Sequence, residues 1–417
     1  MISGTYRMTW VIGVFLSFSL SGLAQVTTAT LYGTVTDPSG ANVPGATVVL
    51  THQQTGATVE KVAGDAGDFQ FDFLRVGTYN IRIESPGFKR SVSSAIELAA
   101  GQNVRQTYPL QVGDVSESVQ VEGASPLVNT VSAEQLQSYG GKKVMDLPLS
   151  RRNFSSILGI GAGVTPAAGG SATGIRLNGV GKNGTAFSVD GTEASGNPEG
   201  RNAQNFGGVN YVDILSLESI EEVHIVKGIL PAEYGGALGG QVNVLSRSGT
   251  NVFHGSLFEN FQAENLNARD PFLNRKPPFT YNQFGGSGGG PIIKNRIFLF
   301  GAYEGYRESQ LDRVEGNVPT QTMRDTVLRA VPAFADALAP VPVPNQPHNP
   351  QATNALYVGT GRSIRRDNHA DAKGDIRITD TSNLSLTYSR GRPYRLTPTI
   401  YFGTLLSKTG DNRCDTY

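Results

Sequence analysis

Short runs of alternating apolar and polar residues fill the chain between residues 30 and 112. Each run ends in glycine, proline, asparagine or aspartate, as at Pro38-Ser39-Gly40 and Gln53-Gln54-Thr55-Gly56. This pattern is typical of half-buried strands that are joined by tight turns. About seven such strands in one short segment predict a small sandwich of two packed sheets.

Aromatic residues lie at strand spacing in this segment, at Phe69, Phe71, Phe73 and Tyr79. A sugar site would need exposed aromatic side chains, whereas aromatic residues that alternate with polar ones usually fill a core. We therefore expect all four side chains to lie in the core of the sandwich.

From residue 126 to residue 250 the strands are shorter and glycines separate them. Residues 176–179 and 187–191 each place a strand directly before an Asn-Gly or Asp-Gly turn. Residues 220–228 form a strand that ends in glycine, and another strand follows at residues 241–244. Because short helices are also expected before residue 160, this segment is predicted to be a small α+β domain.

The clearest two-sided strand pattern lies between residues 369 and 390. Its polar members are Asp371, Lys373 and Asp375 on one run, and Ser385, Thr387 and Ser389 on the next. The residues between them, such as Leu384, Leu386 and Tyr388, are mostly small or apolar. One face is compatible with lipid and the other is polar, as in outer-membrane barrels, although a soluble antiparallel sheet gives the same alternation.

Three earlier strand candidates, at residues 254–263, 284–290 and 296–307, alternate less regularly. Glu259 and Glu304 share a face with apolar side chains in these runs. The stretch from 312 to 366 contains seven prolines and is expected to be a long loop with one helix near residues 322–338.

The N-terminus has the pattern of an export signal. Arg7 precedes an apolar run at residues 10–20 and the small residues Gly22-Leu23-Ala24. A membrane anchor would need about 20 predominantly apolar residues and fewer serines. We expect residues 1–24 to direct export, and a later membrane crossing to use strands, because no other stretch is long and apolar enough for a helix.

Composition supports an exported β protein. The chain has 51 glycines in 417 residues, above the usual share of roughly 7%, and 17% charged residues. Its single cysteine, Cys414, excludes an internal disulfide. The formal net charge is zero, so the overall electrostatics give no reason to expect nucleic acid as a partner.

Enzyme motifs are absent or lack their structural context. The run Gly285-Gly286-Ser287-Gly288-Gly289 matches a nucleophile elbow in letters, but Pro291 and another strand follow where the elbow needs a helix. None of the five histidines belongs to a His-Glu-x-x-His pair. We expect no catalytic residue, no metal site and no cofactor.

The segment from 30 to 110 resembles the carboxypeptidase regulatory-like domain, which has a prealbumin-like fold and a carbohydrate-binding-like relative. The resemblance rests on residues 33–37, Gly40, residues 43–46 and Val48. It implies a fold, and only weakly a ligand.

Residues 176–244, and above all the run 220–249, resemble the plug domain of TonB-dependent outer-membrane receptors of the Oar-like branch. Residues 251–259 and 289–305 resemble the first barrel strands of the same receptors. A barrel of that kind has about 22 strands of about 9 to 11 residues. The resemblance therefore implies an N-terminal fragment of a receptor, with an incomplete barrel that should form an open, curved sheet.

The segment from 115 to 124 alternates valines with acidic and hydroxyl residues. It resembles the TonB box, an extended segment that pairs with a strand of the periplasmic coupling protein by β-augmentation. The candidate residues are Glu117, Ser118, Val119, Gln120 and Val121. The same segment could instead be the last strand of the sandwich, and both interpretations stay open.

The predicted fold is mainly β, with a prealbumin-like sandwich (26–112), a linker (113–125), an α+β plug (126–250) and the start of a large antiparallel barrel (251–417). The predicted function is energy-coupled uptake of an unidentified solute across the outer membrane. The expected partners are a TonB-type coupling protein, outer-membrane lipid and an extracellular solute, for which a carbohydrate-derived molecule is one option. The alternatives are a membrane-anchored carbohydrate-binding or adhesion protein and a soluble periplasmic sandwich protein.

Overall fold

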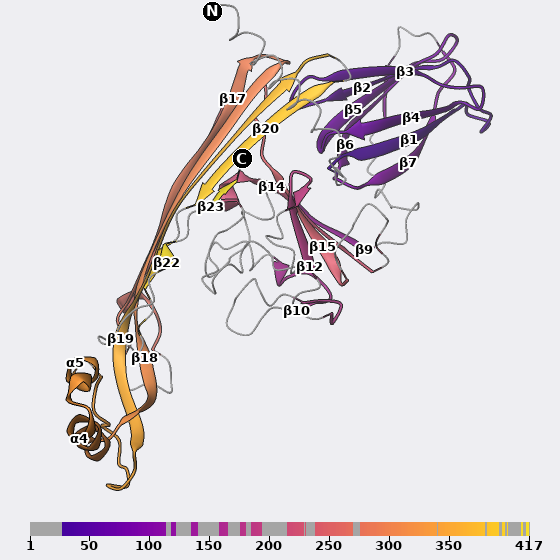
Figure 1. Cartoon of the computed structure of the whole chain (residues 1–417). Coiled ribbons are helices and arrows are strands. Elements are labelled where there is room, and N and C mark those ends of the chain that lie inside the picture. The colour runs from indigo at the N-terminus through magenta and orange to yellow at the C-terminus, as the bar shows by residue number, and fades with distance from the viewer. Residues whose placement is uncertain are drawn as a thin grey trace, which may run out of the picture.

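The computed structural model describes residues 27–113, most of residues 215–391, and shorter stretches between and after them. The expected export signal at residues 1–24 and the candidate residue Glu117 lie outside the described residues. The fold is mainly β and has three parts that follow one another along the chain (Figure 1).

The first part is a sandwich of two sheets. One sheet has the order β4-β1-β7 and the other the order β3-β2-β5-β6-β8. Their strands are β1 (Ala29–Thr36), β2 (Thr47–His52), β3 (Thr58–Val62), β4 (Asp68–Leu74), β5 (Gly77–Glu84), β6 (Arg90–Leu98), β7 (Asn103–Pro109) and β8 (Ser118–Val121). The inward residues of both sheets form one apolar core, which includes Leu31, Leu50, Phe71, Ile81 and Ile83.

Three of the four aromatic residues expected in this core are buried there, but Phe73 is not. Phe69, Phe71 and Tyr79 are almost fully buried, whereas the Phe73 side chain is 85% exposed. Phe73 has a φ of 55°, and the pairing of β1 with β4 shifts register beside it. This bulge inserts one extra residue, so that Leu74 takes the inward position. Alternation alone could not predict it.

The second part, which we call the middle domain, is built on a sheet with the order β13-β12-β15-β14-β9. Its strands are β9 (Gln135–Gly140), β12 (Thr185–Val189), β13 (Thr192–Glu193), β14 (Ile220–Lys227) and β15 (Gly240–Ser246). The 3-10 helix η4 (Leu217–Ser219) precedes β14, and β10 (Val164–Thr165) pairs with β11 (Arg176–Leu177). A small apolar core that includes Phe187, Val223 and Val242 holds the sheet together.

The third part is an antiparallel sheet of long strands, which we call the wall. Its main strands are β16 (His254–Ala263), β17 (Phe279–Ile293), β18 (Ile297–Pro319), β19 (Asn354–Arg377) and β20 (Asn383–Gly391). The short strands β21 (Tyr394–Leu396), β22 (Gly410–Asp411) and β23 (Cys414–Thr416) add to it. In the described part of the chain the wall is open, because its order runs from β16 to β23 without closing.

Large apolar side chains are exposed on the outer face of the wall, among them Leu257, Phe261, Ile292, Leu299, Tyr303 and Leu386. The inner face carries buried polar residues, but also the buried aromatic residues Phe298 and Phe300. Phe298 lines a cleft between the wall and the sandwich. Apolar residues thus occur on both faces of β18, which explains why its alternation is imperfect.

The expected long loop at residues 312–366 is much shorter than predicted. Strands β18 and β19 pair without interruption up to Pro319 and Asn354. Six of the seven prolines lie beyond that pair, in a tip that also holds α4 (Gln321–Ala330), η6 (Pro332–Phe334) and α5 (Ala335–Leu338). In place of the one helix expected near residues 322–338, the structure has α4 and α5 with η6 between them, while the flanking residues continue the strands.

Arg324 organises this tip. Its guanidinium donates hydrogen bonds to the carbonyl oxygens of Pro319, Leu338, Val341 and Pro342. A buried guanidinium needs several acceptors, and these four carbonyls provide them.

Among the described helices, none is long and apolar enough to cross a membrane.

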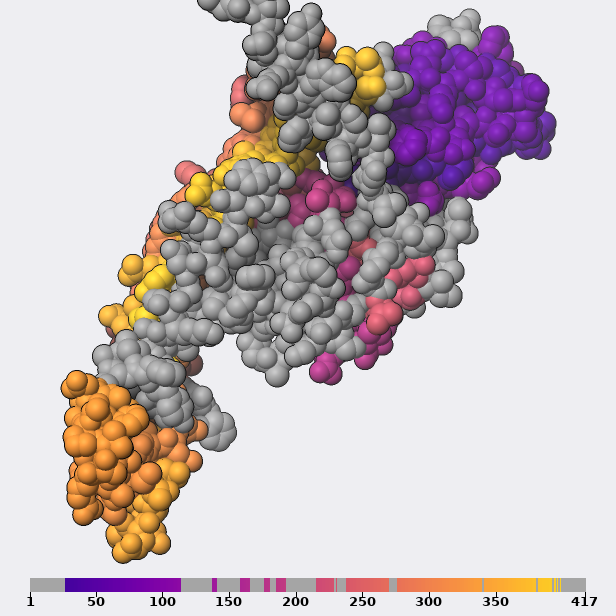
Figure 2. All heavy atoms as spheres, viewed as in Figure 1, coloured from indigo at the N-terminus to yellow at the C-terminus, as the bar shows by residue number. Residues whose placement is uncertain are grey.

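The three parts meet at one end of the wall. The sandwich lies beside the ends of β17 and β20, while α4 and α5 lie at the opposite end (Figure 1). Figure 2 shows the sandwich as a separate lobe, coloured indigo to purple. The sheet of the middle domain lies on the inner side of the wall, next to the sandwich (Figure 1).

Candidate functional site

The hairpin of β19 and β20 presents a ladder of polar side chains to the inside of the wall. Three cross-strand pairs form this polar ladder, namely Asp371 with Ser389, Lys373 with Thr387, and Asp375 with Ser385. Successive residues of a strand point to opposite faces, so all six lie on the same side of the sheet. Each rung of the ladder holds a different segment of the chain.

The middle rung binds Asp190, which follows β12. Lys373 Nζ lies 3.3 Å from Asp190 Oδ1, and Thr387 Oγ1 donates to Asp190 Oδ2 at 2.9 Å. Ser246, at the end of β15, donates to the same carboxylate through both its backbone N–H and its hydroxyl. Lys373 also donates to the Ser246 carbonyl oxygen at 3.1 Å. A carboxylate and an ammonium group that are both largely removed from water are thus paired and hydrogen-bonded.

Local structure sets the position of Asp190. Its φ is 48°, in the left-handed region that aspartate tolerates, and its N–H donates to Val244 O at 2.9 Å. The Asp-Gly turn that the sequence predicts therefore does more than reverse the chain. It also turns a carboxylate toward the wall.

The rung of Asp371 binds the start of η4. Asp371 Oδ2 accepts from the Ser216 N–H at 3.0 Å and from the Ser219 hydroxyl at 2.6 Å. Its other oxygen accepts from Ser389 at 2.6 Å and lies 2.9 Å from His369 Nε2. The carboxylate therefore joins the middle domain to two wall strands.

Glu218 binds the same short helix to the strands at the other edge of the wall, β16 and β17. It is fully buried, and its Oε2 accepts from Ser256 at 2.5 Å and from Ser287 at 3.5 Å. These serines pair across β16 and β17. Glu218 and Ser219, two consecutive residues of η4, thus reach both halves of the described wall, and β14 starts directly after them.

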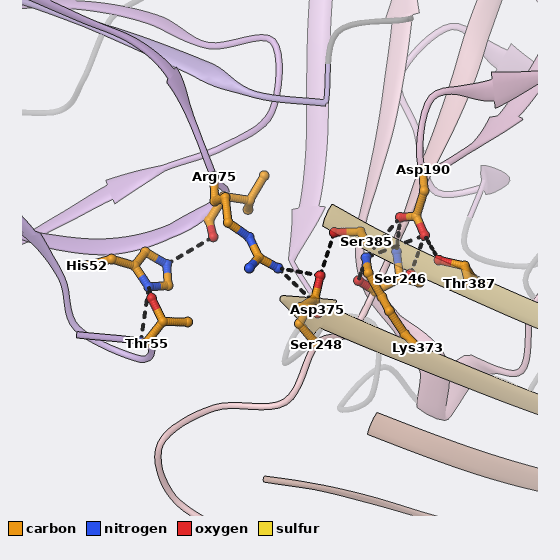
Figure 3. A network of polar contacts seen from close by, with 11 residues as sticks. His52, Thr55, Arg75, Asp190, Ser246, Ser248, Lys373, Asp375, Ser385 and Thr387 are labelled. Carbon is orange, nitrogen blue, oxygen red and sulfur yellow. Dashed lines mark hydrogen bonds and ion pairs between the residues drawn. The ribbon is translucent and has the colours of Figure 1, made fainter. Parts of the chain in front are cut away.

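The third rung binds the sandwich. Arg75 Nη2 lies 3.3 Å from Asp375 Oδ1 and donates to Ser248 Oγ at 2.8 Å. Ser385 donates to the same Asp375 oxygen at 2.6 Å. Figure 3 shows Arg75 reaching from the sandwich to Asp375 and Ser248, with Asp190, Ser246 and Lys373 on the next rung.

A second group of contacts holds the sandwich at the turns of the wall. The Asn251 N–H donates to Gln54 O at 2.9 Å, and Arg377 Nη2 donates to Thr58 O at 3.2 Å. Asn251 also donates to the Asn295 side chain at 2.6 Å. The turn between β2 and β3 therefore lies against the start of the wall and its first short turn.

His52 connects the two segments of the sandwich that contact the wall, namely the turn between β2 and β3 and the loop of Arg75 between β4 and β5 (Figure 3). Its Nε2 lies 3.3 Å from Val76 O, next to Arg75, and its Nδ1 lies 2.8 Å from Thr55 Oγ1. A carbonyl can only accept, so Nε2 carries the proton and Nδ1 accepts from Thr55. Burial lowers the pKa of His52 to about 4, which keeps the ring neutral.

The structure places four of the five TonB-box candidates in the strand β8 (Ser118–Val121). Its backbone pairs in parallel with β6, from Arg90 opposite Ser118 to Ser93 opposite Val121. β8 is the last strand of its sheet. The alternative interpretation of this segment, a final sandwich strand, thus describes the backbone pairing of residues 118–121.

The polar ladder was visible in the sequence, but its partners were not. Asp190 was identified only as a turn residue, and Glu218 and Arg75 carried no signal. Alternation predicts that a side chain faces inward, but it does not predict which distant segment that side chain meets. Within the described residues there is no cluster of three or more His, Cys, Asp or Glu side chains that could hold a metal ion.

Three family models match the chain in succession. The carboxypeptidase regulatory-like domain matches residues 30–111, the TonB-dependent receptor plug domain matches residues 114–241, and an outer membrane beta barrel domain matches residues 245–337. Together they cover the sandwich, the middle domain and the start of the wall, in the order that the sequence predicts.

Two curated relatives agree with these matches. The chain is 28% identical over 352 residues to the TonB-dependent transporter Oar of Myxococcus xanthus, which covers 78% of this chain and 32% of the relative. It is 29% identical over 163 residues to the protein named "Probable TonB-dependent siderophore receptor PirA" of Acinetobacter baumannii, with 36% and 20% covered. The chain thus spans a third or less of the length of these relatives.

Among solved structures, the outer membrane transporter YddB of Escherichia coli aligns with a TM-score of 0.42 and 14% identity. The alignment covers 63% of this chain and 33% of that one.

Proposed function

We propose that this chain, which belongs to the TonB-dependent outer-membrane receptors of the Oar-like type, takes part in energy-coupled uptake of a solute through the outer membrane. In this proposal the middle domain is the plug, the wall is barrel, and the sandwich lies on the periplasmic side. The short turns of the wall lie beside the sandwich and the long tip lies at the other end. Outer-membrane barrels place short turns in the periplasm and long loops outside.

The main support for the proposal is the polar character of the contact surface between the middle domain and the wall, which we call the seat. Asp190, Glu218 and Ser219 bind the wall through ion pairs and hydrogen bonds. Water can replace such contacts as they open, whereas an apolar interface would lose its full burial energy at once. Such contacts suit a plug that stays bound to the barrel at rest and moves when a coupling protein pulls on it.

The coupling partner in this proposal is a periplasmic TonB-type protein that binds β8. A strand at the end of a sheet offers a row of backbone groups to an incoming strand. β8 occupies that position in the five-stranded sheet of the sandwich. The TonB-box candidates Ser118 to Val121 would therefore be presented by the sandwich itself.

Photo-crosslinking in cells that express the full-length receptor and the coupling protein tests this step. A photoreactive amino acid that replaces Val119 should give a product with the coupling protein. The matched control replaces Glu60, an exposed residue on β3 at the opposite edge of the same sheet, and should give none. Equal yields at the two positions, or no product at position 119, would refute the proposed contact.

Uptake of labelled ferric siderophores tests the transport step, because the name of one relative refers to a siderophore. Accumulation should depend on the proton-motive force and should be lost when residues 117–121 are deleted. If no member of a broad siderophore panel accumulates, this solute class is wrong. If accumulation survives the deletion, the role of the segment is wrong.

A further inference from the structure

We infer that Arg75 is a latch: when the sandwich undocks, Lys373 transfers from Asp190 to Asp375, and the middle domain loses one of its anchors on the wall. The inference rests on the proposed function only for its purpose, which is to release the plug. Its geometry stands on the described residues alone.

Two ion pairs, Lys373 with Asp190 and Arg75 with Asp375, occupy neighbouring rungs of the polar ladder. Asp375 and Lys373 lie two residues apart on one face of β19, and their partners Ser248 and Ser246 are also two residues apart. Arg75 and Lys373 are both cations whose charges act on Asp375. Asp375 is 2% exposed, so its carboxylate is removed from water.

Removal of Arg75 leaves a charge imbalance that Lys373 can correct. Once Arg75 leaves, the Asp375 carboxylate has lost its ion pair, and its charge attracts the neighbouring cation Lys373. Lys373 lies on the same face of β19 as Asp375, and its flexible four-carbon stem and three donors allow it to turn toward that carboxylate. Asp190 would then lose its ammonium partner and keep only neutral donors from Ser246 and Thr387.

The sandwich is built to present Arg75 at this position. The bulge at Phe73, with its φ of 55°, turns Leu74 inward and leads the chain out toward the wall. The Tyr79 hydroxyl donates to the Arg75 carbonyl oxygen at 2.8 Å, and His52 bonds to the next carbonyl. A bulky residue in the left-handed region is uncommon and costs free energy, which is consistent with a positioning role.

The strand that would receive the pull belongs to the same sheet. β8 pairs with β6, β6 pairs with β5, and β5 begins at Gly77, two residues after Arg75. A load applied at β8 therefore reaches the sandwich, and with it Arg75. The latch would open first, and the transfer of Lys373 would follow.

Hydrogen exchange of the purified full-length receptor, without solute or coupling protein, tests this order of events. Arg75→Ala should speed exchange in residues 185–190 and 240–246 by about tenfold, while exchange in the sandwich core strand β5 stays unchanged. Arg82→Ala is the matched control, because Arg82 is an exposed sandwich arginine that pairs with Glu84 in its own domain. It should leave all these segments unchanged.

The double variant Arg75→Ala with Asp375→Asn separates charge transfer from simple loss of docking. Without the Asp375 charge, Lys373 has no reason to leave Asp190, so protection of residues 185–190 should return although the sandwich stays undocked. Asp375→Asn alone should also leave that protection intact. If the double variant exchanges as fast as Arg75→Ala, or if Arg75→Ala changes nothing, the inference is overturned. Neither readout depends on transport, so a failure of the proposed function is detected separately.

Discussion

The sandwich and the seat of the middle domain are both buried, but they are held by opposite kinds of contact. Inside the sandwich, Phe71, Leu31 and Ile83 pack against one another with almost no exposed surface. At the seat, Asp190 and Glu218 bind charged and hydroxyl groups of the wall, and Asp371 of the wall accepts hydrogen bonds from Ser216 and Ser219. An apolar core is insensitive to charge and costs much free energy to open, whereas a polar seat can be opened in steps. In the proposed function, the apolar sandwich core stays folded while the middle domain moves from its polar seat.

The largest expected effect comes from a cavity in the apolar region. Phe71→Ala should lower the free energy of unfolding of the sandwich by about 3 to 5 kcal/mol, because the lost ring leaves a cavity in a close-packed core. Hydrogen exchange of β1 and β5 in the full chain measures this change. Phe73→Ala, two residues away on the exposed bulge, is the control and should change it by less than about 0.5 kcal/mol. Similar losses for the two variants would contradict the observed burial.

The next effect is the pH dependence of the sandwich. His52 has a pKa of about 4 when folded against 6.5 for the free side chain, so folding favours its neutral form. Its contribution is complete above pH 6.5 and is lost as the pH falls toward 4, up to about 3 kcal/mol. Unfolding followed between pH 7 and pH 4 should show this loss, and His52→Gln should remove it.

A smaller effect is expected when the seat loses one charge. Lys373→Met should weaken the anchoring of the middle domain by about 2 kcal/mol, because Asp190 keeps its hydroxyl and amide donors but loses its ion pair. Combining it with Asp190→Asn should recover part of that loss, which a double-mutant cycle measures from exchange of residues 185–190. Full additivity of the two changes would show that the pair is not coupled.

The smallest effect concerns the strained bulge. Phe73→Gly should stabilise the sandwich by up to about 1 kcal/mol, because glycine adopts a positive φ without steric cost. The unfolding midpoint of the sandwich should rise slightly. A clear loss of stability would mean that the exposed ring makes contacts that its exposure does not indicate.

The fold could be predicted from the sequence where pattern and turn chemistry agree. The hairpin of β19 and β20 and its two faces follow from the alternation of residues 371–389, and the Asp190 turn follows from its Asp-Gly pair. Phe73 could not be placed, because one bulge residue reverses the faces of a strand. The full length of β18 and β19 could not be predicted from the sequence, because polar residues also pair well in the part of a hairpin that extends beyond the membrane.

Only the wall residues of the candidate site could be predicted from the sequence. The inward rungs of the wall are periodic, but Arg75, Asp190 and Glu218 lie in turns or short helices where no period exists. Their partners are 183 residues away in the case of Asp190 and Lys373. Pairings over such separations depend on the packing of whole domains, and local pattern does not encode them.

The tip closed by Arg324 has a practical consequence. β18 is 23 residues long, and roughly 10 residues suffice to cross the bilayer, so the hairpin extends roughly 40 Å beyond it. Four carbonyl contacts to the Arg324 guanidinium help to close the end of this stalk. In the proposed orientation, the exposed segment at residues 332–337 is a suitable insertion point for an epitope tag, which the stalk would display above the cell surface.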